Sequence, residues 1–353
     1  MAERERIEIV MNMLLDNRRK QNSFSFLFLL LVHCRRFFVD FKKMQVKFLK
    51  QISDPVNGEA QISAICFSPN GQKLAICVDR VVQLYDEMGE LRDRFATKPI
   101  DSKYGRQSYV VTAMDFAPDS TQLAVAQSDN IVFVYKLGTD WNEKKSIVAK
   151  FVQSAHVTSL IWLPDGQIIF GLADGKIRSG NVKKNKSHTL YTAEQYTASL
   201  ASNVTRKAIL SGHADGSICR YIIEDEGTGD KAGLVVRHSC PPCALVWSAH
   251  GILVGGCDRR IVVYSKDGKI LQQFDYSRET DEREFSVGIC NPTGQECVFG
   301  SYDHIRLFSY QPRKGMFDEA PTKDIRNMYT VTAMAWRSGF ENELFKLTLL
   351  FCL

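Results

Sequence analysis

The sequence has no hydrophobic run long enough to cross a membrane as a helix. Its most membrane-like stretch, FSFLFLLLV, is only the nine residues from Phe24 to Val32, whereas a spanning helix needs about 20. It is also a poor secretion signal, because acidic residues precede it and Arg35-Arg36 follow it in place of a small-residue cleavage site. We therefore expect no transmembrane segment, and a peripheral amphipathic anchor is the remaining membrane alternative.

The chain also lacks the concentrated positive charge of nucleic-acid-binding proteins. Its formal net charge is +5, but residues 1–43 alone hold nine Lys or Arg against five Asp or Glu. The rest of the chain is close to neutral, so it offers no basic stripe to a phosphate backbone. We therefore expect no nucleic-acid partner.

Motifs of enzymes and cofactor sites are missing as well. There is no Gly-x-x-x-x-Gly-Lys loop to hold a phosphate, and no recognisable nucleophile motif accompanies His213, which we interpret as structural. Cys240-Pro-Pro-Cys243 has the spacing of half a zinc site or of a redox pair, but no second pair lies at suitable spacing. The ten cysteines are too scattered for a disulfide framework. We expect no catalytic residue, no cofactor and no metal.

What the sequence does contain is one pattern repeated six times. Short runs rich in Val, Ile, Phe and Tyr are separated by turn sequences such as Pro-Asn-Gly and Pro-Asp-Gly, which predicts strand, turn, strand, turn, strand in each copy. The copies are ISAICFSPNGQKLAICVDRVVQLYD from Ile62, VTAMDFAPDSTQLAVAQSDNIVFVYK from Val111, VTSLIWLPDGQIIFGLADGKIRSGN from Val157, TASLASNVTRKAILSGHADGSICRY from Thr197, PCALVWSAHGILVGGCDRRIVVYS from Pro242 and FSVGICNPTGQECVFGSYDHIRLFS from Phe285.

One aspartate stands in the second turn of each copy, and the spacing between successive aspartates is 41 to 50 residues. A period of about 40–45 residues is typical of WD-type β-propellers, in which each repeat forms a four-stranded blade. Aspartate in a tight turn accepts hydrogen bonds from nearby backbone amides. We therefore interpret the six as structural turn residues and not as metal ligands or catalytic acids: Asp79, Asp129, Asp174, Asp215, Asp258 and Asp303.

The repeats are degenerate. The Trp-Asp dipeptide is absent, and the third copy has Gly180 where the others end their third strand with an aromatic residue. A seventh copy begins with VTAMAW at Val331 to Trp336, but the tail after Ser338 has neither the turn nor the aspartate. We therefore expect an all-β WD-repeat propeller of six recognisable blades plus the first strand of a seventh. Such a ring would be open, and we expect the chain alone to be marginal in stability, prone to aggregation through its open strand edges, or completed by another chain.

Several strings resemble one known family along nearly all of residues 44–338. They include CVDRVVQLYDEMGELRDRFATKP, KYGRQSYVVTAMDFAPDS, SDNIVFVYKLGTDW, ILSGHADGSICRY, GCDRRIVVYSKDG, LQQFDYSRE and GSYDHIRLF. These strings are similar to the first propeller of the intraflagellar transport protein 172 family. The resemblance implies a subunit of intraflagellar transport complex B, needed for cilium assembly and located at the cilium and ciliary base on the cytoplasmic side. It also suggests intraflagellar transport protein 57 as a partner.

These observations divide the chain into three parts. We expect residues 1–43 to be an N-terminal extension that is helical or disordered, residues 44–338 to form the propeller, and residues 339–353 to be an aberrant or truncated tail. The expected function is a non-enzymatic protein-interaction scaffold. The alternatives are a WD-repeat adaptor of another assembly, such as a vesicle coat or a ubiquitin ligase, and a propeller enzyme.

Overall fold

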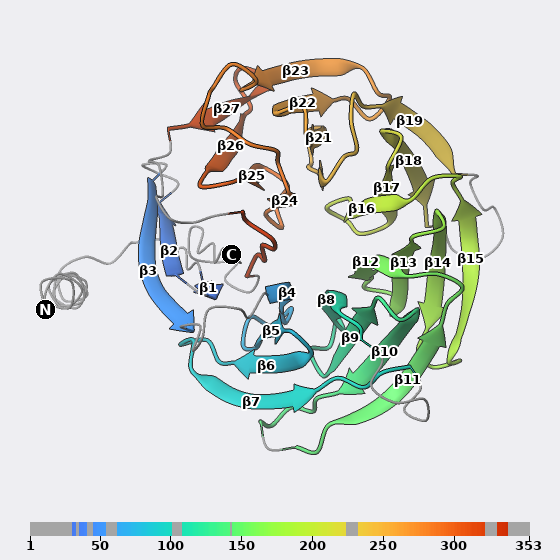
Figure 1. The fold of residues 1–353 in the computed structure, drawn as a ribbon. Helices are drawn as coiled ribbons and strands as arrows, with labels where there is room; N and C mark the ends of the chain where they lie inside the picture. Colours follow the sequence, from blue (N-terminus) through green and yellow to red (C-terminus); the bar gives the residue numbers. More distant parts are fainter. Residues whose placement is uncertain are drawn as a thin grey trace, which may run out of the picture.

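Six four-stranded antiparallel sheets are arranged around a ring (Figure 1). The computed structural model describes residues 62–100, 108–141, 143–223, 232–321 and 330–337, together with the backbone of three strands between residues 30 and 53. These residues form strands and turns, and within them no helix is long and apolar enough to span a bilayer. The predicted all-β propeller with six blades is confirmed.

The first three sheets follow one another along the chain. The first contains β4 (Ile62–Phe67), β5 (Leu74–Val78), β6 (Val81–Tyr85) and β7 (Leu91–Ala96). The second contains β8 (Val111–Phe116), β9 (Gln122–Gln127), β10 (Ile131–Lys136) and β11 (Ser146–Val152). The third contains β12 (Val157–Trp162), β13 (Gln167–Leu172), β14 (Lys176–Asn181) and β15 (Lys186–Thr192).

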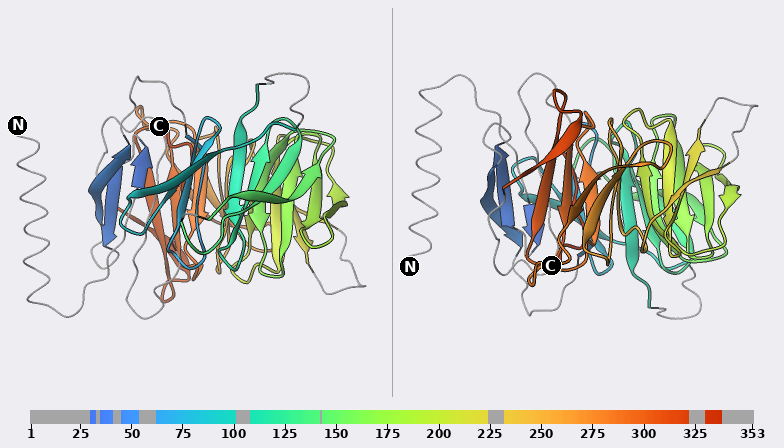
Figure 2. Two further views of the ribbon diagram at one scale, coloured as in Figure 1. Left: turned by 90° about the horizontal axis from the view of Figure 1, so that it is seen from below. Right: turned by 90° about the horizontal axis from the view of Figure 1, so that it is seen from above.

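The other three sheets repeat this order. The fourth contains β16 (Thr197–Ser202), β17 (Ala208–His213), β18 (Ser217–Ile222) and β19 (Gly233–Arg237). The fifth contains β20 (Ala244–Trp247), β21 (Ile252–Gly255), β22 (Arg260–Tyr264) and β23 (Ile270–Asp275). The sixth contains β24 (Val287–Cys290), β25 (Glu296–Gly300), β26 (Ile305–Gln311) and β27 (Met316–Ala320). Each sheet therefore runs outward, from an inner first strand to an outer fourth strand (Figures 1 and 2).

Turn residues separate the strands at the predicted places. In the first sheet, Gly71 has a φ of 68° and donates its N–H to the carbonyl of Ser68 at 2.8 Å. The second sheet places Ser120 at the equivalent position with a φ of 63°, a backbone conformation that glycine adopts more readily. These tight turns make each first and second strand a hairpin.

The hydrophobic core lies between the sheets. Each of five buried clusters combines side chains from two neighbouring sheets. In one of them, Phe151 of the second sheet lies 6.2 Å from Phe170 of the third, measured between ring centroids. Each sheet thus buries its apolar faces against its neighbours in the ring.

The irregular third repeat is explained by this packing. A Cβ atom at Gly180 would lie only 3.0 to 3.2 Å from ring atoms of Phe151. The phenylalanine comes from β11, the outer strand of the preceding sheet. Its ring therefore lies directly against the position at which the other third strands carry an aromatic residue.

A smaller sheet occupies the gap between the sixth and first sheets. It contains β1 (Leu30–Val32), β2 (Arg35–Asp40) and β3 (Gln45–Ser53), with β3 in the middle. Strand β1 runs parallel to β3, and β2 runs antiparallel to it. Figure 1 shows this sheet in the ring between β4–β7 and β24–β27.

Residues 330–337 bridge the same gap nearer the centre of the ring. On one side, Val331 donates its N–H to the carbonyl of Ser301 at 3.3 Å. On the other, the Thr332 hydroxyl donates to the carbonyl of Ile62 at 3.2 Å, and Arg337 Nε donates to the carbonyl of Gly71 at 2.9 Å. Its one strand-like pairing in the described structure is the bridge between Thr330 and Tyr302.

Two expectations from the sequence need correction here. The open ring is wrong, because residues 330–337 and the sheet β1–β3 occupy the position of the seventh blade. A helical or disordered extension is wrong for residues 30–32 and 35–40, which are strands, and the expected boundary at residue 44 falls inside one sheet. The reason is that both segments pair with β3: β2 forms an antiparallel hairpin with it, and β1 pairs with it in parallel, which no hairpin pattern encodes. The expected tail at residues 339–353 lies outside the described residues.

A substitution at Val331 tests how much this bridge contributes to the free energy of unfolding. Its side chain is fully buried, and its methyl groups lie against Gly300 of the sixth sheet. We expect Val331→Asp to lower the free energy of unfolding by roughly 3 kcal/mol, because it buries a carboxylate without a partner. Urea unfolding measures this, with Val152→Asp on an exposed position of β11 as the control. Equal losses in the two variants would contradict a closing role for the bridge.

Glu296 predicts a pH dependence of stability. It begins β25, is almost fully buried and accepts a hydrogen bond from the Asn291 side chain. Burial raises the pKa of its carboxyl group from 4.5 to about 7. The folded protein therefore loses stability as the pH rises from about 4.5 to about 7, because only the unfolded chain ionises freely in that range.

The shift corresponds to at most about 3 kcal/mol. Between pH 5 and pH 8 we expect the unfolding free energy of the wild-type chain to fall more than that of Glu296→Gln. The control is Glu194→Gln, which changes an exposed residue and should behave like the wild type. If the unfolding free energies of the wild type and Glu296→Gln changed equally with pH, burial would not raise the pKa of the Glu296 carboxyl group.

Candidate functional site

The six aspartates expected in the second turns lie between the second and third strands of their sheets. Asp79 follows β5, Asp129 follows β9, Asp174 follows β13, Asp215 follows β17, Asp258 follows β21 and Asp303 follows β25. In three sheets the carboxylate accepts a hydrogen bond from the backbone N–H two residues later, at Lys176, Ser217 and Arg260. The first and sixth sheets differ, because Asp79 and Asp303 themselves have positive φ angles.

The second carboxylate oxygen bonds outside the turn, to the connection that enters the blade or to the outer strand of the same sheet. Asp174 accepts from the Ser154 hydroxyl at 3.1 Å, and Asp215 accepts from Arg237 at 3.0 Å. In the second sheet, Asp129 accepts from the backbone N–H of Ile100 at 2.8 Å. These contacts join the turn between the second and third strands to the connection from the preceding sheet, at Ile100 and Ser154, or to the outer strand, at Arg237.

The local hydrogen bonds also set the charge state of two of these groups. The Ser217 side chain is the main cause that lowers the pKa of Asp215, and Arg237 lowers it further. For Asp174, burial acts to raise the pKa, but Lys176 and Ser154 together lower it. Both side chains are therefore carboxylates at neutral pH.

His213 is held inside the fourth sheet. It is fully buried at the end of β17, where its Nε2 atom lies 2.7 Å from the Ser211 hydroxyl and its Nδ1 atom 3.1 Å from the carbonyl of Gln195. Burial lowers the pKa of the imidazole, which is therefore neutral. Both ring nitrogens are used within the structure, as the structural interpretation predicted.

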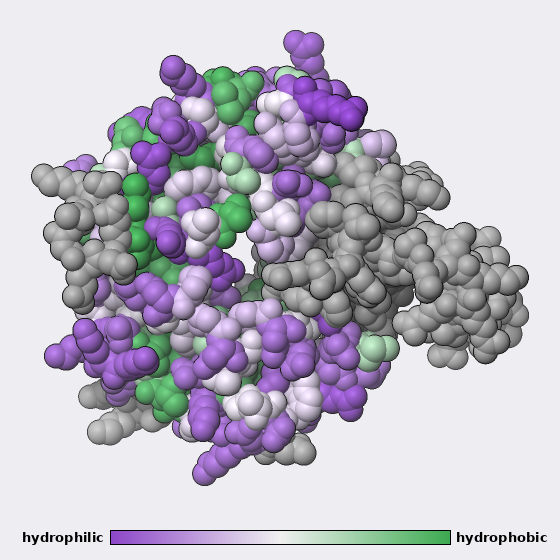
Figure 3. Space-filling model, turned by 180° about the vertical axis from the view of Figure 1, so that it is seen from behind, coloured by the Kyte–Doolittle hydropathy of each residue, from purple (hydrophilic) through white to green (hydrophobic). Residues whose placement is uncertain are grey.

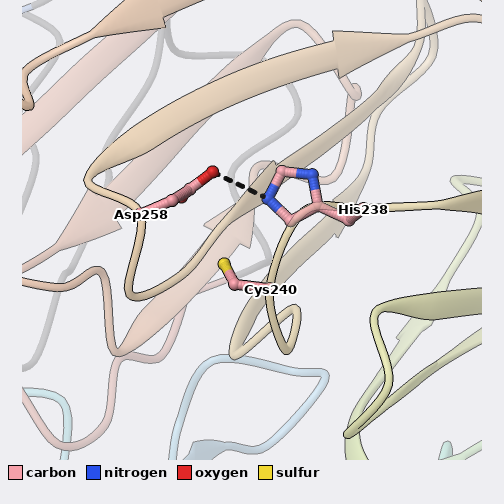
Figure 4. A group of neighbouring side chains, drawn as sticks. All are labelled: His238, Cys240 and Asp258. Atoms are coloured by element: carbon pink, nitrogen blue, oxygen red, sulfur yellow. Dashed lines mark ion pairs between the residues drawn. The ribbon is translucent and has the colours of Figure 1, made fainter.

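The two cysteines of Cys240-Pro-Pro-Cys243 lie in different environments. Cys240 is buried, whereas Cys243 is exposed. The groups that surround Cys240 are His238 and Asp258, whose ligand atoms lie with its sulfur within 4.8 Å of one another (Figure 4). Within the described residues this is the one group of three side chains able to hold a metal ion.

Exposed apolar side chains concentrate on the rim of the ring. Most of the large ones that the described residues expose lie on outer strands: Leu91 of β7, Val148 and Val152 of β11, Leu234 of β19, Ile270 and Leu271 of β23, and Met316 of β27. The ring face in Figure 3 is mostly hydrophilic, with an opening near its middle.

The WD-repeat interpretation is confirmed by a family model. The model described as "WD domain, G-beta repeat" matches residues 49–86, 97–136 and 147–179. A chain in a "Crystal Structure of Mitotic Checkpoint Complex" has the same fold, with a TM-score of 0.61 and 16% sequence identity over 79% of this chain and 81% of that one. At this identity the likeness concerns the fold alone.

Much stronger similarity connects the sequence to curated proteins. "Intraflagellar transport protein 172 homolog" of Mus musculus is 52% identical over 295 residues, which is 83% of this chain. The chain is homologous to intraflagellar transport protein 172. The protein of that name in Chlamydomonas reinhardtii is 41% identical over 303 residues, and the homologue of Drosophila melanogaster is 48% identical over 295. The chain spans 17% of the length of these intraflagellar transport proteins.

Sequence reasoning missed His238. The residue follows β19 and donates its backbone N–H to the carbonyl of Gly216 at 2.8 Å. Gln153 and Tyr276 make the equivalent bonds in the second and fifth sheets, so this position carries a different residue type in each blade. The available signal was a histidine five residues before Cys243.

The turn aspartates make a testable contribution to stability. We expect Asp215→Ala to lower the free energy of unfolding by about 1 kcal/mol, because the Ser217 N–H loses its acceptor and Arg237 loses its partner. Thermal or urea unfolding measures the change. Asp267→Ala, in an exposed turn of the fifth sheet, is the control and should remain within about 0.5 kcal/mol of wild type. Indistinguishable unfolding of the two variants would remove the structural role assigned to Asp215.

Proposed function

We propose that the chain is a non-enzymatic scaffold that assembles with intraflagellar transport complex B and serves cilium assembly. The observation that carries this proposal is the identity of 41 to 52% to proteins named intraflagellar transport protein 172 over 83% of the chain. Its place of action is the cilium and the ciliary base, on the cytoplasmic side. Intraflagellar transport protein 57 is the proposed direct partner.

The structure supports a scaffold through its surface. A ring of sheets packed against one another is rigid, and it presents loops and outer strands to partners. Strands β19 and β23 approach each other on this rim, because Gly268, two residues before β23, lies against the backbone of Val235 in β19. We propose that the rim at Leu234, Ile270 and Leu271 contacts a complex B subunit.

Two other functions remain as alternatives. A WD-repeat adaptor of a vesicle coat or a ubiquitin ligase would use the same fold with different partners. A propeller enzyme would need a set of reacting side chains brought together at one place. The six turn aspartates are distributed one to a sheet, which favours the scaffold.

Affinity purification from ciliated cells tests the proposal. The tagged full chain should co-purify complex B subunits, and purified intraflagellar transport protein 57 should bind it directly. Leu234→Asp combined with Ile270→Asp should reduce recovery at least about tenfold, because both place charge in an apolar contact. Met88→Asp, at an equally exposed turn residue, is the matched control.

Each alternative has its own outcome in this experiment. Coat or ligase subunits recovered without complex B would overturn the ciliary assignment. Recovery of complex B that is insensitive to the double substitution would move the binding surface away from the rim and leave the scaffold role in place.

A further inference from the structure

Two cysteines face each other across the first hairpin of the sixth sheet. Cys290 ends β24, and Cys297 is its register partner in β25. Their sulfur atoms lie 3.6 Å apart. The next pair along the hairpin is joined by a backbone hydrogen bond of 2.9 Å, from the N–H of Asn291 to the carbonyl of Glu296. Because hydrogen-bonded and non-hydrogen-bonded pairs alternate in an antiparallel ladder, Cys290 and Cys297 form a non-hydrogen-bonded pair.

The backbone at this pair has the spacing that a disulfide needs. A non-hydrogen-bonded pair holds its Cα atoms about 4.5 Å apart, and disulfides join Cα atoms that are about 4.4 to 6.8 Å apart. The two side chains also lie on the same face of the sheet, since residues directly opposite each other do so. Side-chain rotation, with no change of strand register, therefore brings the two sulfur atoms to bonding distance.

The sixth copy of the repeat differs from the others at both positions of this pair. In four other sheets the same two positions hold an aromatic residue opposite an aliphatic one. These pairs are Phe67–Leu74, Phe116–Leu123, Trp162–Ile168 and Trp247–Ile252. In the fourth sheet the pair is Ser202–Ile209. Among the six described sheets, the sixth is the one in which two thiols meet at this position.

The two thiols differ in their access to solvent. Cys290 is partly exposed, whereas Cys297 is fully buried in the cluster shared by the fifth and sixth sheets. Burial is also the main cause that raises the pKa of the Cys297 thiol. A small oxidant therefore reaches Cys290 first, while Cys297 remains a protonated thiol beside it.

We propose that Cys290 and Cys297 are an oxidation site, at which a hydroperoxide produces an intramolecular disulfide. The Cys290 sulfur attacks one peroxide oxygen and the O–O bond breaks. The thiol proton goes to the departing oxygen, so the products are a sulfenic acid at Cys290 and an alcohol, or water when the oxidant is hydrogen peroxide. The Cys297 sulfur then attacks the Cys290 sulfur, and the S–O bond breaks as the S–S bond forms. The hydroxide leaves as water with the Cys297 proton, so that two electrons have passed from the two thiols to the peroxide.

The disulfide joins two strands that both contact the bridge at residues 330–337. Ser286, which precedes β24, donates its hydroxyl to the carbonyl of Val331 at 2.5 Å. Gly300, which ends β25, lies against the Val331 side chain. Oxidation thus cross-links the hairpin on which the bridge rests.

Hydrogen peroxide is the probe, applied to the full 353-residue chain after reduction and removal of the reductant. Unreacted thiols are then alkylated under denaturing conditions, and the chain is cut with trypsin. The peptide of residues 284–306 contains both cysteines. After oxidation it should be two hydrogens lighter than its reduced form and carry no alkyl group. Cleavage after Glu296 should give two fragments that stay joined until a reductant is added.

Three variants separate the two steps. Cys290→Ser should leave Cys297 as a free thiol, because the oxidant does not reach the buried sulfur. Cys297→Ser removes the second thiol, so the sulfenic acid at Cys290 should accumulate, and its adduct with dimedone should increase several-fold over the wild type. Cys243→Ser is the control, because it removes an exposed cysteine outside the pair, and its peptide 284–306 should be oxidised as in the wild type.

The outcomes decide the proposal in either direction. A disulfide within residues 284–306 of the wild type and of Cys243→Ser supports it, even where Cys290→Ser fails to fold. A folded wild-type chain in which Cys290 and Cys297 stay free while exposed cysteines are oxidised overturns it. A disulfide from Cys290 to any other cysteine overturns it as well, as does a sulfinic acid at Cys290 beside a free Cys297.

Discussion

Packing between neighbouring sheets is the constraint on which the rest of this structure depends. A sheet in the ring has two apolar faces, and each of the five buried clusters is shared between two adjacent sheets. No blade can bury both faces without a neighbour on either side. The sixth and first sheets therefore need something between them, and the strands β1–β3 and residues 330–337 occupy that place. The ring must therefore close for every sheet to bury both of its apolar faces.

The regular part of the fold could be predicted from the sequence because its signals are local. Turn sequences such as Pro69-Asn70-Gly71 and the spacing of the second-turn aspartates fix the strand order within each blade. The exceptions depend on residues that are distant in sequence. Gly180 looks like a defect until Phe151 of the preceding sheet is seen to cover it, and the pairing of β1 with β3 is parallel and so cannot come from a simple hairpin.

The turn aspartates and Cys240 show the same limit of prediction from sequence. Their positions follow from local patterns, but the residues that they contact do not. An aspartate after the second strand can be located by its period, whereas its partners, such as Ser154 for Asp174, come from the segment leading into the blade. The Cys-Pro-Pro-Cys spacing suggested a pair, but the fold turns Cys240 inward and leaves Cys243 exposed. The neighbours of Cys240 are set by how the fourth and fifth sheets pack, and spacing along the chain does not report that.

Residues 330–337 form the junction at which the ring joins segments that are distant in sequence. Neighbouring sheets elsewhere follow each other directly along the chain, but Thr332 bonds to a residue 270 positions away. Closing so long a loop has the largest entropic cost of any junction in the ring. The contacts at this junction must therefore offset the largest loop-closure entropy in the ring, whereas the other five junctions join sheets that are consecutive in the chain.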